Sequence, residues 1–180
     1  TIVGAVAEHI KKDLSLSDTQ LGLLTGFAFA IFYATLGIPL AMLSDRTNRR
    51  NIVSGAVAVW SVMTALCGLA GNYWQLVAAR IGVGIGEAGS SPQSHSMIAD
   101  MYAPHERSGA LGFYALGVYL GGMLGFLVGA PLAEVWGWRS VFFVVGLPGL
   151  LIAALIFFTV SEPTRGLFEG KSASPRKVQT

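Results

Sequence analysis

Charged residues are scarce in this sequence. Only 12% of its 180 residues are Asp, Glu, Lys or Arg, whereas soluble globular domains carry about a quarter. Its single cysteine, Cys67, leaves no second thiol for an intrachain disulfide or a zinc site. With a net charge of +2 and no broad basic face, the chain does not fit a nucleic-acid-binding protein. No nucleophile–base constellation or metal-ligand cluster stands out, so we expect neither an enzyme nor a metal or cofactor site.

The sequence also lacks an initiator methionine and a signal peptide, so we expect Thr1 to be an internal start. Apolar residues make up 53% of the chain, and mean hydropathy is +0.59. Five nearly uncharged runs are each long enough to cross a bilayer as a helix: residues 21–43, 52–70, 74–99, 108–131 and 141–160. We therefore predict an all-α membrane protein, with a transmembrane bundle over residues 1–160. The polar residues 161–180 read as the start of a cytoplasmic linker.

The basic residues predict the orientation of the bundle. If the spans alternate, three Lys or Arg residues fall on one side: Lys11, Lys12 and Arg139. Eight fall on the other side: Arg46, Arg49, Arg50, Arg107, Arg165, Lys171, Arg176 and Lys177. The second side should be cytoplasmic by the positive-inside rule, and Trp74, Trp136 and Trp138 mark the opposite interface. We expect a multi-pass protein of the cell (inner) membrane, in contact with membrane lipids.

A glycine motif in the third run has two incompatible interpretations. Gly84-Ile85-Gly86-Glu87-Ala88-Gly89 matches the G-x-G-x-x-G pattern of a dinucleotide-binding loop. That loop needs a preceding strand and an acidic residue about 20 positions further on. Here Arg80 and alanines precede it, and Asp100 follows Gly89 by only 11 residues. The glycines therefore indicate close helix packing in lipid.

Glu87 is a carboxylate inside a predicted span. It lies 13 residues after Trp74, which places it about 20 Å along a helix, near the middle of the bilayer. A charged residue there costs roughly 2.5 to 3.5 kcal/mol and typically faces a water-filled cavity or a partner. Because a low dielectric disfavours the ionised form, we predict that Glu87 accepts and releases protons. The alternative is a permanently protonated Glu87 that hydrogen-bonds a neighbouring helix.

Three other residues near Glu87 in the sequence, Arg80, His95 and Pro92, each have two possible interpretations. Arg80 is expected either to attract an anionic substrate group or to extend its charged head to the interface. His95 either titrates near physiological pH or packs through a hydrogen bond. Pro92 removes a helix hydrogen bond, so a kink is expected just past Glu87, either as a tolerated bend or as a hinge. Three polar side chains in apolar runs are candidate cavity contacts: Tyr33, Ser91 and Tyr114.

The loop A-M-L-S-D-R-T-N-R-R, residues 41–50, resembles the signature loop of major facilitator superfamily transporters, G-x-L-a-D-R-x-G-R-R. Ala41 and Asn48 replace the two glycines, and we expect Asn48 to preserve the turn because Asn tolerates left-handed backbone angles. Four residues match the pattern: Asp45, Arg46, Arg49 and Arg50. The resemblance implies that these four latch the cytoplasmic face, with Asp45 near a helix end of a second bundle.

Further motifs extend the resemblance over nearly the whole chain. Arg80-x-x-x-Gly84 is similar to the fourth-helix motif of the superfamily. The series Gly117, Gly121, Gly125, Gly129 is similar to its glycine-rich fifth helix, and we favour helix packing for it. Three further segments are together most similar to the spinster-like branch, which includes lysophospholipid and sphingosine-1-phosphate transporters. They are L-S-D-T-Q-L-G-L-L-T-G-F-A-F-A, R-I-G-V-G-I-G-E-A-G-S-S-P and the late S-E-P-T-R-G.

The resemblance implies a particular fold and activity. The chain would be the amino-terminal six-helix bundle of a twelve-helix carrier, with only the end of its first helix present and the carboxy-terminal bundle missing. The carrier would work by alternating access, coupled to protons through Glu87, on a lysolipid-like or sphingolipid-like substrate. Two alternatives stay open: a small organic-anion carrier with Arg80 as the counter-charge, and a non-transporting membrane scaffold or sensor.

Overall fold

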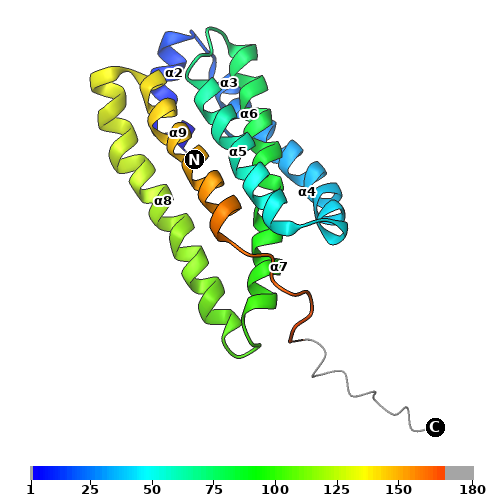
Figure 1. The fold of residues 1–180 in the computed structure, drawn as a ribbon. Helices are drawn as coiled ribbons and strands as arrows, with labels where there is room; N and C mark the ends of the chain where they lie inside the picture. The colour runs from blue at the N-terminus through cyan, green and yellow to red at the C-terminus, as the bar shows by residue number, and fades with distance from the viewer. Residues whose placement is uncertain (1, 169–180) are drawn as a thin grey trace, which may run out of the picture.

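The structure is a computed structural model that describes residues 2–168, apart from the side chains of residues 28, 29, 41 and 44–46. Regular structure in the described part is helical throughout (Figure 1). The elements in chain order are α1 (Ile2–Ala5), α2 (Ala7–Asp13), α3 (Asp18–Gly22), the π-helical turn η1 (Leu23–Phe27), α4 (Ala28–Arg46), α5 (Arg49–Cys67), α6 (Tyr73–Ala88), α7 (Ser91–Met101), α8 (Arg107–Trp136) and α9 (Trp138–Thr159).

Within residues 2–168, four helical stretches are long and apolar enough to cross a membrane: Asp18–Leu40, Arg49–Cys67, Arg107–Trp136 and Trp138–Thr159. The first joins α3, η1 and α4 into one path. The run predicted over residues 74–99 forms two helices instead of one, because α6 ends at Ala88 and α7 begins at Ser91. Pro92 lies in the first turn of α7, where its missing N–H leaves no intrahelical bond unmade.

Polar side chains cap the first turns of α3, α5 and α6. Ser17 and Gln20 form a reciprocal capping box at the start of α3. The side chain of Asn72 accepts a hydrogen bond from the Gln75 N–H, 3.0 Å away, at the start of α6. Asn48 likewise accepts from the Asn51 N–H at 3.1 Å and begins α5. Each cap satisfies a backbone donor that the first helical turn leaves free.

Asn48 preserves the loop for a different reason from the one expected. Its φ is −73° and its ψ 114°, an extended conformation and not a left-handed one. The prediction of left-handed backbone angles at this position was therefore wrong. An amide side chain suits the position because it caps α5, a contact that glycine cannot make.

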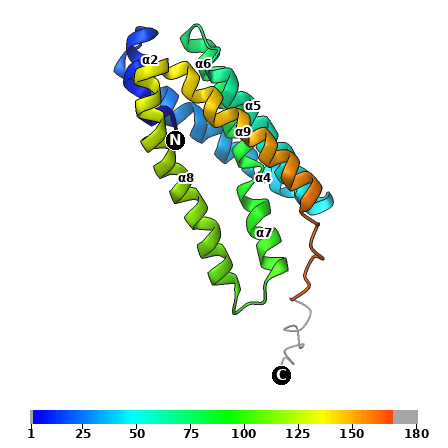
Figure 2. The same ribbon diagram turned by 60° about the vertical axis from the view of Figure 1, so that its left-hand side comes forward.

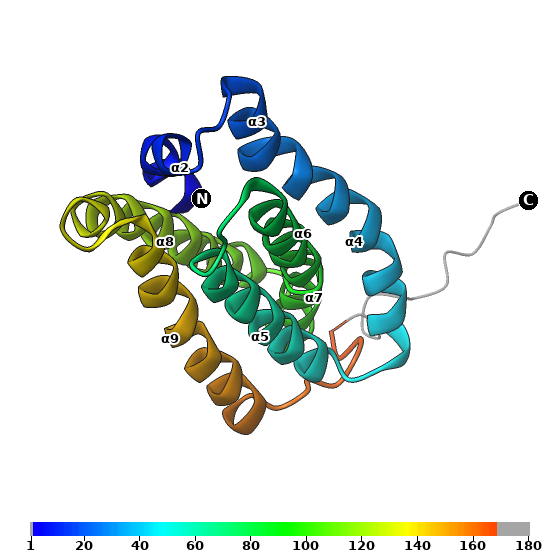
Figure 3. The ribbon, with the colours of Figure 1, turned by 90° about the horizontal axis from the view of Figure 1, so that it is seen from above.

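The helices form a bundle in which α5 and α6 lie inside, with α4, α8 and α9 around them (Figure 3). Glycines allow the closest approaches in this bundle. A Cβ at Gly86 of α6 would lie 2.7 Å from the backbone N of Trp60, and one at Gly146 of α9 would lie 2.8 Å from the N of Ala65. These contacts hold α6 and α9 on two faces of α5, because any larger side chain would push the backbones apart.

Buried apolar residues gather at two levels of the bundle. The larger cluster joins α2 and the end of α5 to the starts of α6 and α9, with Ile10, Leu76 and Phe142 fully buried. The smaller joins α5, α7 and α9 through Val53, Met97 and Ala153. Away from the α2 end, α8 diverges from α9 and meets α7 through a short turn (Figure 2).

Candidate functional site

A cavity of about 480 Å³ lies between α5, α6, α8 and α9 in the middle of the bundle. Its polar lining residues come from α5 and α6, and α8 contributes mainly glycines. The lining consists of Ile2, Trp60, Ser61, Thr64, Arg80, Val83, Glu87, Gly117, Val118, Gly121, Gly122, Gly125, Val145 and Gly146. Arg80 and Glu87 are its charged residues, and a few charged or polar groups within a mostly apolar lining are typical of a binding site.

Arg80 and Glu87 reach this cavity from one face of α6. They are seven residues apart, so two helical turns bring both side chains to the same side of the helix. Arg80 is only 3% exposed, and Glu87 is partly buried. The structure thus brings together the two charged residues that the sequence placed inside the third span.

Two hydroxyl side chains of α5, Ser61 and Thr64, line the cavity as well. Sequence reasoning did not identify them. The available signal was a pair of small polar residues within the run 52–70, three positions apart and therefore on one helical face. Trp60 lies beside them in the lining and packs against Gly86 of α6.

The glycine series of α8 divides into two parts. A Cβ at Gly129 would lie 2.7 Å from Cδ1 of Ile2, and one at Gly125 would lie 3.6 Å from the same atom. Close packing explains these two glycines. At Gly117 and Gly121, a Cβ would meet no described atom within 4 Å, and both residues line the cavity. For these two, the structure shows open space where helix packing was expected.

The other predicted cavity contacts lie elsewhere. Among the described residues, the lining of the central cavity does not include Tyr33, Ser91 or Tyr114. Tyr33 belongs to α4, and Ser91 follows the break after α6. Tyr114 packs edge-on against His95, with 5.1 Å between ring centroids. His95 also makes a 2.8 Å hydrogen bond through Nδ1 with the Ser91 carbonyl, which is the packing alternative for this residue.

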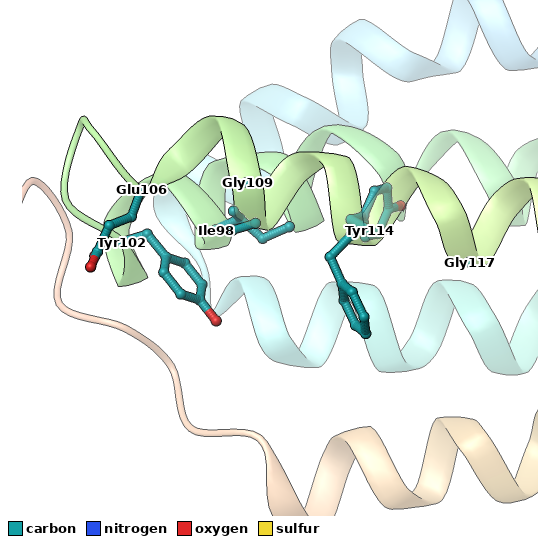
Figure 4. Close-up of a pocket in the computed structure, with 8 residues that line it drawn as sticks. Ile98, Tyr102, Glu106, Gly109, Tyr114 and Gly117 are labelled. Carbon is teal, nitrogen blue, oxygen red and sulfur yellow. The ribbon is translucent and has the colours of Figure 1, made fainter.

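Tyr114 lines a second cavity, of about 590 Å³, between α7 and α8 near their connecting turn. Figure 4 shows Tyr102 and Glu106 at one end of this cavity and Tyr114 and Gly117 at the other. Gly117 lines both cavities. The two spaces therefore adjoin along α8, although their charged residues differ.

Arg49 forms a buried ionic network at the expected cytoplasmic end. Its guanidinium is 4% exposed and contacts Asp100 at 2.6 Å and Glu162 at 2.8 Å. It also donates to Ser96 Oγ at 2.8 Å and to the Pro163 carbonyl at 3.2 Å. One side chain of α5 thereby connects α7 with the segment after α9, because a guanidinium carries five donors in a fixed fork.

Glu162 and Asp100 extend this network to the backbone. Glu162 accepts a hydrogen bond from the Arg50 N–H at 2.9 Å, and Asp100 accepts one from the Gly166 N–H at 3.0 Å. Burial alone would raise the pKa of Glu162, but hydrogen bonds from Arg50 and Arg49 outweigh it and hold this pKa below its ordinary value. Neither carboxylate was predicted to be a partner of Arg49 from the sequence.

The remaining residues of the signature loop differ in what is described. Arg50 lies over the Phe157 ring, with its guanidinium carbon 5.0 Å from the centroid. Asp45 and Arg46 end α4, but their side chains lie outside the described residues. Beyond the loop, Arg165 donates to the Thr47 carbonyl. Of the four residues predicted to form the latch, the structure therefore describes the side chains of Arg49 and Arg50 only.

A third polar cluster joins three segments at the opposite end. Arg139 contacts Asp13 at 2.7 Å and donates to the Ala70 carbonyl at 3.1 Å. Its guanidinium carbon lies 4.3 Å from the ring centroid of Trp138, whose indole N–H also donates to Asp13. The hydrogen bond from Arg139 lowers the pKa of Asp13. In the described part of the chain, no group of three or more His, Cys, Asp or Glu residues could hold a metal ion.

Comparison with known proteins identifies the family of the chain. The family model of the Major Facilitator Superfamily matches residues 1–180. An "MFS-type efflux pump" of Mycolicibacterium smegmatis (strain ATCC 700084 / mc(2)155) is 39% identical over 173 residues, which are 96% of this chain and 39% of the relative. "Protein spinster homolog 1" of Xenopus laevis is 32% identical over 176 residues, which are 96% of this chain and 33% of the relative.

A solved structure agrees with these relatives. It is the crystal structure of a bacterial homolog to the human lysosomal transporter Spinster, in an inward-facing and occupied conformation. It is 41% identical, with a TM-score of 0.80 over 95% of this chain and 42% of that one. The chain thus spans less than half the length of the relatives it matches. It is an integral membrane protein of the Major Facilitator Superfamily and resembles the spinster-like branch of that family.

Proposed function

We propose that the complete protein is a proton-coupled secondary transporter of the cell (inner) membrane that works by alternating access. The observation that carries this proposal is the central cavity, where Arg80 and Glu87 face one space from a single face of α6. Intramembrane ionisable residues in transport proteins typically face a cavity and mark an ion or substrate path. Family membership supports the transport part of this proposal.

Glu87 is the proton site in this scheme. A carboxyl group in a partly buried, apolar cavity ionises only when water or a positive charge compensates it. Arg80 lines the same cavity and supplies positive charge. When an anionic substrate approaches Arg80, this compensation weakens and Glu87 favours its protonated form. Substrate and proton binding are therefore coupled through the charge of the cavity.

Arg49 and the signature loop control the cytoplasmic face. The network of Arg49, Asp100 and Glu162 fastens α5 to α7 and to the segment after α9. These three segments would then move together as one rigid unit. Asp45 and Arg46, at the end of α4, would contact a second bundle of the complete protein and latch it in one state. Rocking of the two bundles about the cavity would alternate access.

The preferred substrate class is a lysolipid or sphingolipid. Its supports are the resemblance to the spinster-like branch and the largely apolar lining of the cavity beside Arg80. A small organic anion is the second candidate, because Arg80 alone is a sufficient counter-charge. A membrane scaffold or sensor that retained this architecture is the third.

The test is transport by the complete protein in proteoliposomes, comparing wild type with Glu87→Gln. Gln keeps the size of the side chain but cannot exchange a proton. We expect the variant to lose pH-gradient-driven uptake while it retains exchange of substrate across the membrane. Glu134→Gln is the matched control, because Glu134 is an exposed carboxylate of α8 outside the cavity lining.

A panel of lysolipids and organic anions then separates the substrate classes. Competition by a lipid headgroup analogue favours the first class, and competition by a carboxylate metabolite favours the second. Gradient-driven transport that is equal in wild type and Glu87→Gln would refute the coupling role and make Glu87 a buried structural carboxyl. Absence of counterflow for every candidate would leave the scaffold alternative.

A further inference from the structure

Ser61 of α5 carries a buried hydroxyl group that the fold does not satisfy. The side chain is 1% exposed, and its Oγ has no hydrogen-bond partner among the described residues. Buried polar groups in native proteins nearly always have a partner, so an exception needs an explanation. Ser54, two turns earlier on α5, shows the ordinary arrangement, because its Oγ donates to the Ala153 carbonyl at 2.9 Å.

The position of Ser61 offers an explanation. Ser61 lines the central cavity, and so does Thr64 one turn further along α5. The Ser61 hydroxyl itself lies against α9 where that helix has a glycine: a Cβ at Gly149 would lie 2.1 Å from Ser61 Oγ. The hydroxyl is thus held between α5 and α9, and the Ser61 residue borders the cavity.

The contacts between α5 and α6 show at which level of α6 the hydroxyl groups of Ser61 and Thr64 lie. A Cβ at Gly86 would contact Trp60, and a Cβ at Gly82 would contact Met63. Residues 60–63 of α5 therefore lie beside residues 82–86 of α6. Ser61 and Thr64 are then at the level between Arg80 and Glu87, where a molecule bound at Arg80 would extend.

We propose that Ser61, with Thr64 beside it, hydrogen-bonds a hydroxyl group of the substrate whose anionic group faces Arg80. This inference rests on the proposed transport function and narrows its substrate to hydroxylated anions. A serine hydroxyl both donates and accepts, and therefore matches a substrate hydroxyl in either direction. Lysolipids and sugar acids share this chemistry, since both place a free hydroxyl near a negatively charged group.

The experiment uses the complete protein in proteoliposomes and two pairs of probes. Lysophosphatidylcholine is paired with its 2-deoxy analogue, and gluconate with hexanoate, which lacks hydroxyl groups. We expect Ser61→Ala to raise KM for the hydroxylated member of one pair about tenfold, the value of one hydrogen bond of ordinary strength. The deoxy member should be unaffected, and Thr64→Val should act in the same direction. The pair that responds identifies the source of the hydroxyl.

Ser54→Ala is the matched control on the same helix. It removes a satisfied hydroxyl outside the cavity lining, so it should lower the melting temperature and leave KM unchanged. Ser61→Ala should leave the melting temperature unchanged, because the lost hydroxyl has no partner in the described fold. Ser54→Ala would thus change only the melting temperature, and Ser61→Ala only KM. This difference would not arise if both serines only packed α5 against α9.

Each contrary result has its own meaning. If wild type transports a probe but Ser61→Ala leaves its KM unchanged, the inference is wrong and the transport function stands. If the variant raises KM equally for hydroxylated and deoxy probes, Ser61 shapes the cavity and does not bind the hydroxyl. Transport of neither pair by the wild type would overturn the proposed function, and this inference with it.

Discussion

Replacing Asp100 by Asn tests whether the Arg49 network holds the bundle end together. Asp100 Oδ2 lies 2.6 Å from Arg49 Nη1, and Asp100 Oδ1 accepts from the Gly166 N–H at 3.0 Å. Asn keeps the shape and can still accept one of these hydrogen bonds. The substitution therefore removes mainly the negative charge beside a guanidinium that is 4% exposed.

The expected loss is large because both partners are buried. Removing one member of a buried ion pair typically costs about 3–5 kcal/mol, since the other charge is left uncompensated. Glu162 remains 2.8 Å from Arg49 Nε and still supplies one negative charge, so we expect about 2–3 kcal/mol for Asp100→Asn. At roughly 2–4 °C per kcal/mol for a domain of this size, the melting temperature should fall by about 4–12 °C.

The assay is thermal unfolding of the complete protein in detergent, with Glu106→Gln as the control. Glu106 is an exposed carboxylate at the same end of the bundle, and its only charged contact in the described residues is His105 at 3.9 Å. Its replacement should shift the melting temperature by less than about 2 °C, because exposed pairs contribute little. Equal shifts for Asp100→Asn and Glu106→Gln would refute the reasoning. Adding Arg49→Met to a variant without both carboxylates should restore stability, because it removes the buried charge itself.

Two further predictions follow from the same end and from the α5–α6 contact. Because the pKa of Glu162 is lowered from its ordinary 4.5, its ion pairing contributes fully above that pH and is lost as the pH falls through the lowered value. The melting temperature of the wild type should therefore drop more steeply below about pH 4 than that of Glu162→Gln, and parallel curves would contradict this. Gly86→Ala places a Cβ 2.7 Å from the Trp60 backbone N and should destabilise by about 1–3 kcal/mol. Gly55→Ala on an exposed face of α5 meets no atom of the described residues within 4 Å, so its melting temperature should be unchanged or higher. Equal losses in the two variants would contradict the packing argument.

The helical membrane fold was predictable because it depends on signals that are local in sequence. Long uncharged runs, basic loops and interfacial tryptophans each act within one span and its flanks. The break in the run 74–99 was only partly visible. Pro92 predicted a kink after Glu87, but Pro92 itself lies in the first turn of α7, and the helix ends earlier, at Ala88. Gly89 and Ser90, the two residues between the helices, carried no separate signal in the sequence.

The candidate site was predictable as far as it depends on rare residues. A charge within an apolar run is unusual enough to identify Arg80 and Glu87 without any contact information. Ser61 and Thr64 were missed, because a hydroxyl in a membrane helix is common and its role depends on which helix it faces. Partners of Arg49 were missed for the same reason: Asp100 and Glu162 are distant in sequence and meet only through the packing of α5, α7 and α9.

The contacts on both sides of the break decide between a hinge and a fixed bend. Before it, α6 packs on α5 at Gly86, where even a methyl group would not fit. After it, α7 is fastened to the first turn of α5 by the Arg49–Asp100 pair. Bending at Gly89 and Ser90 would therefore have to open one of these contacts, since α5 is a single continuous helix across both. We conclude that the break between α6 and α7 is a fixed bend. If the complete protein transports by the proposed mechanism, movement of the whole bundle and not bending at Gly89 and Ser90 would alternate access.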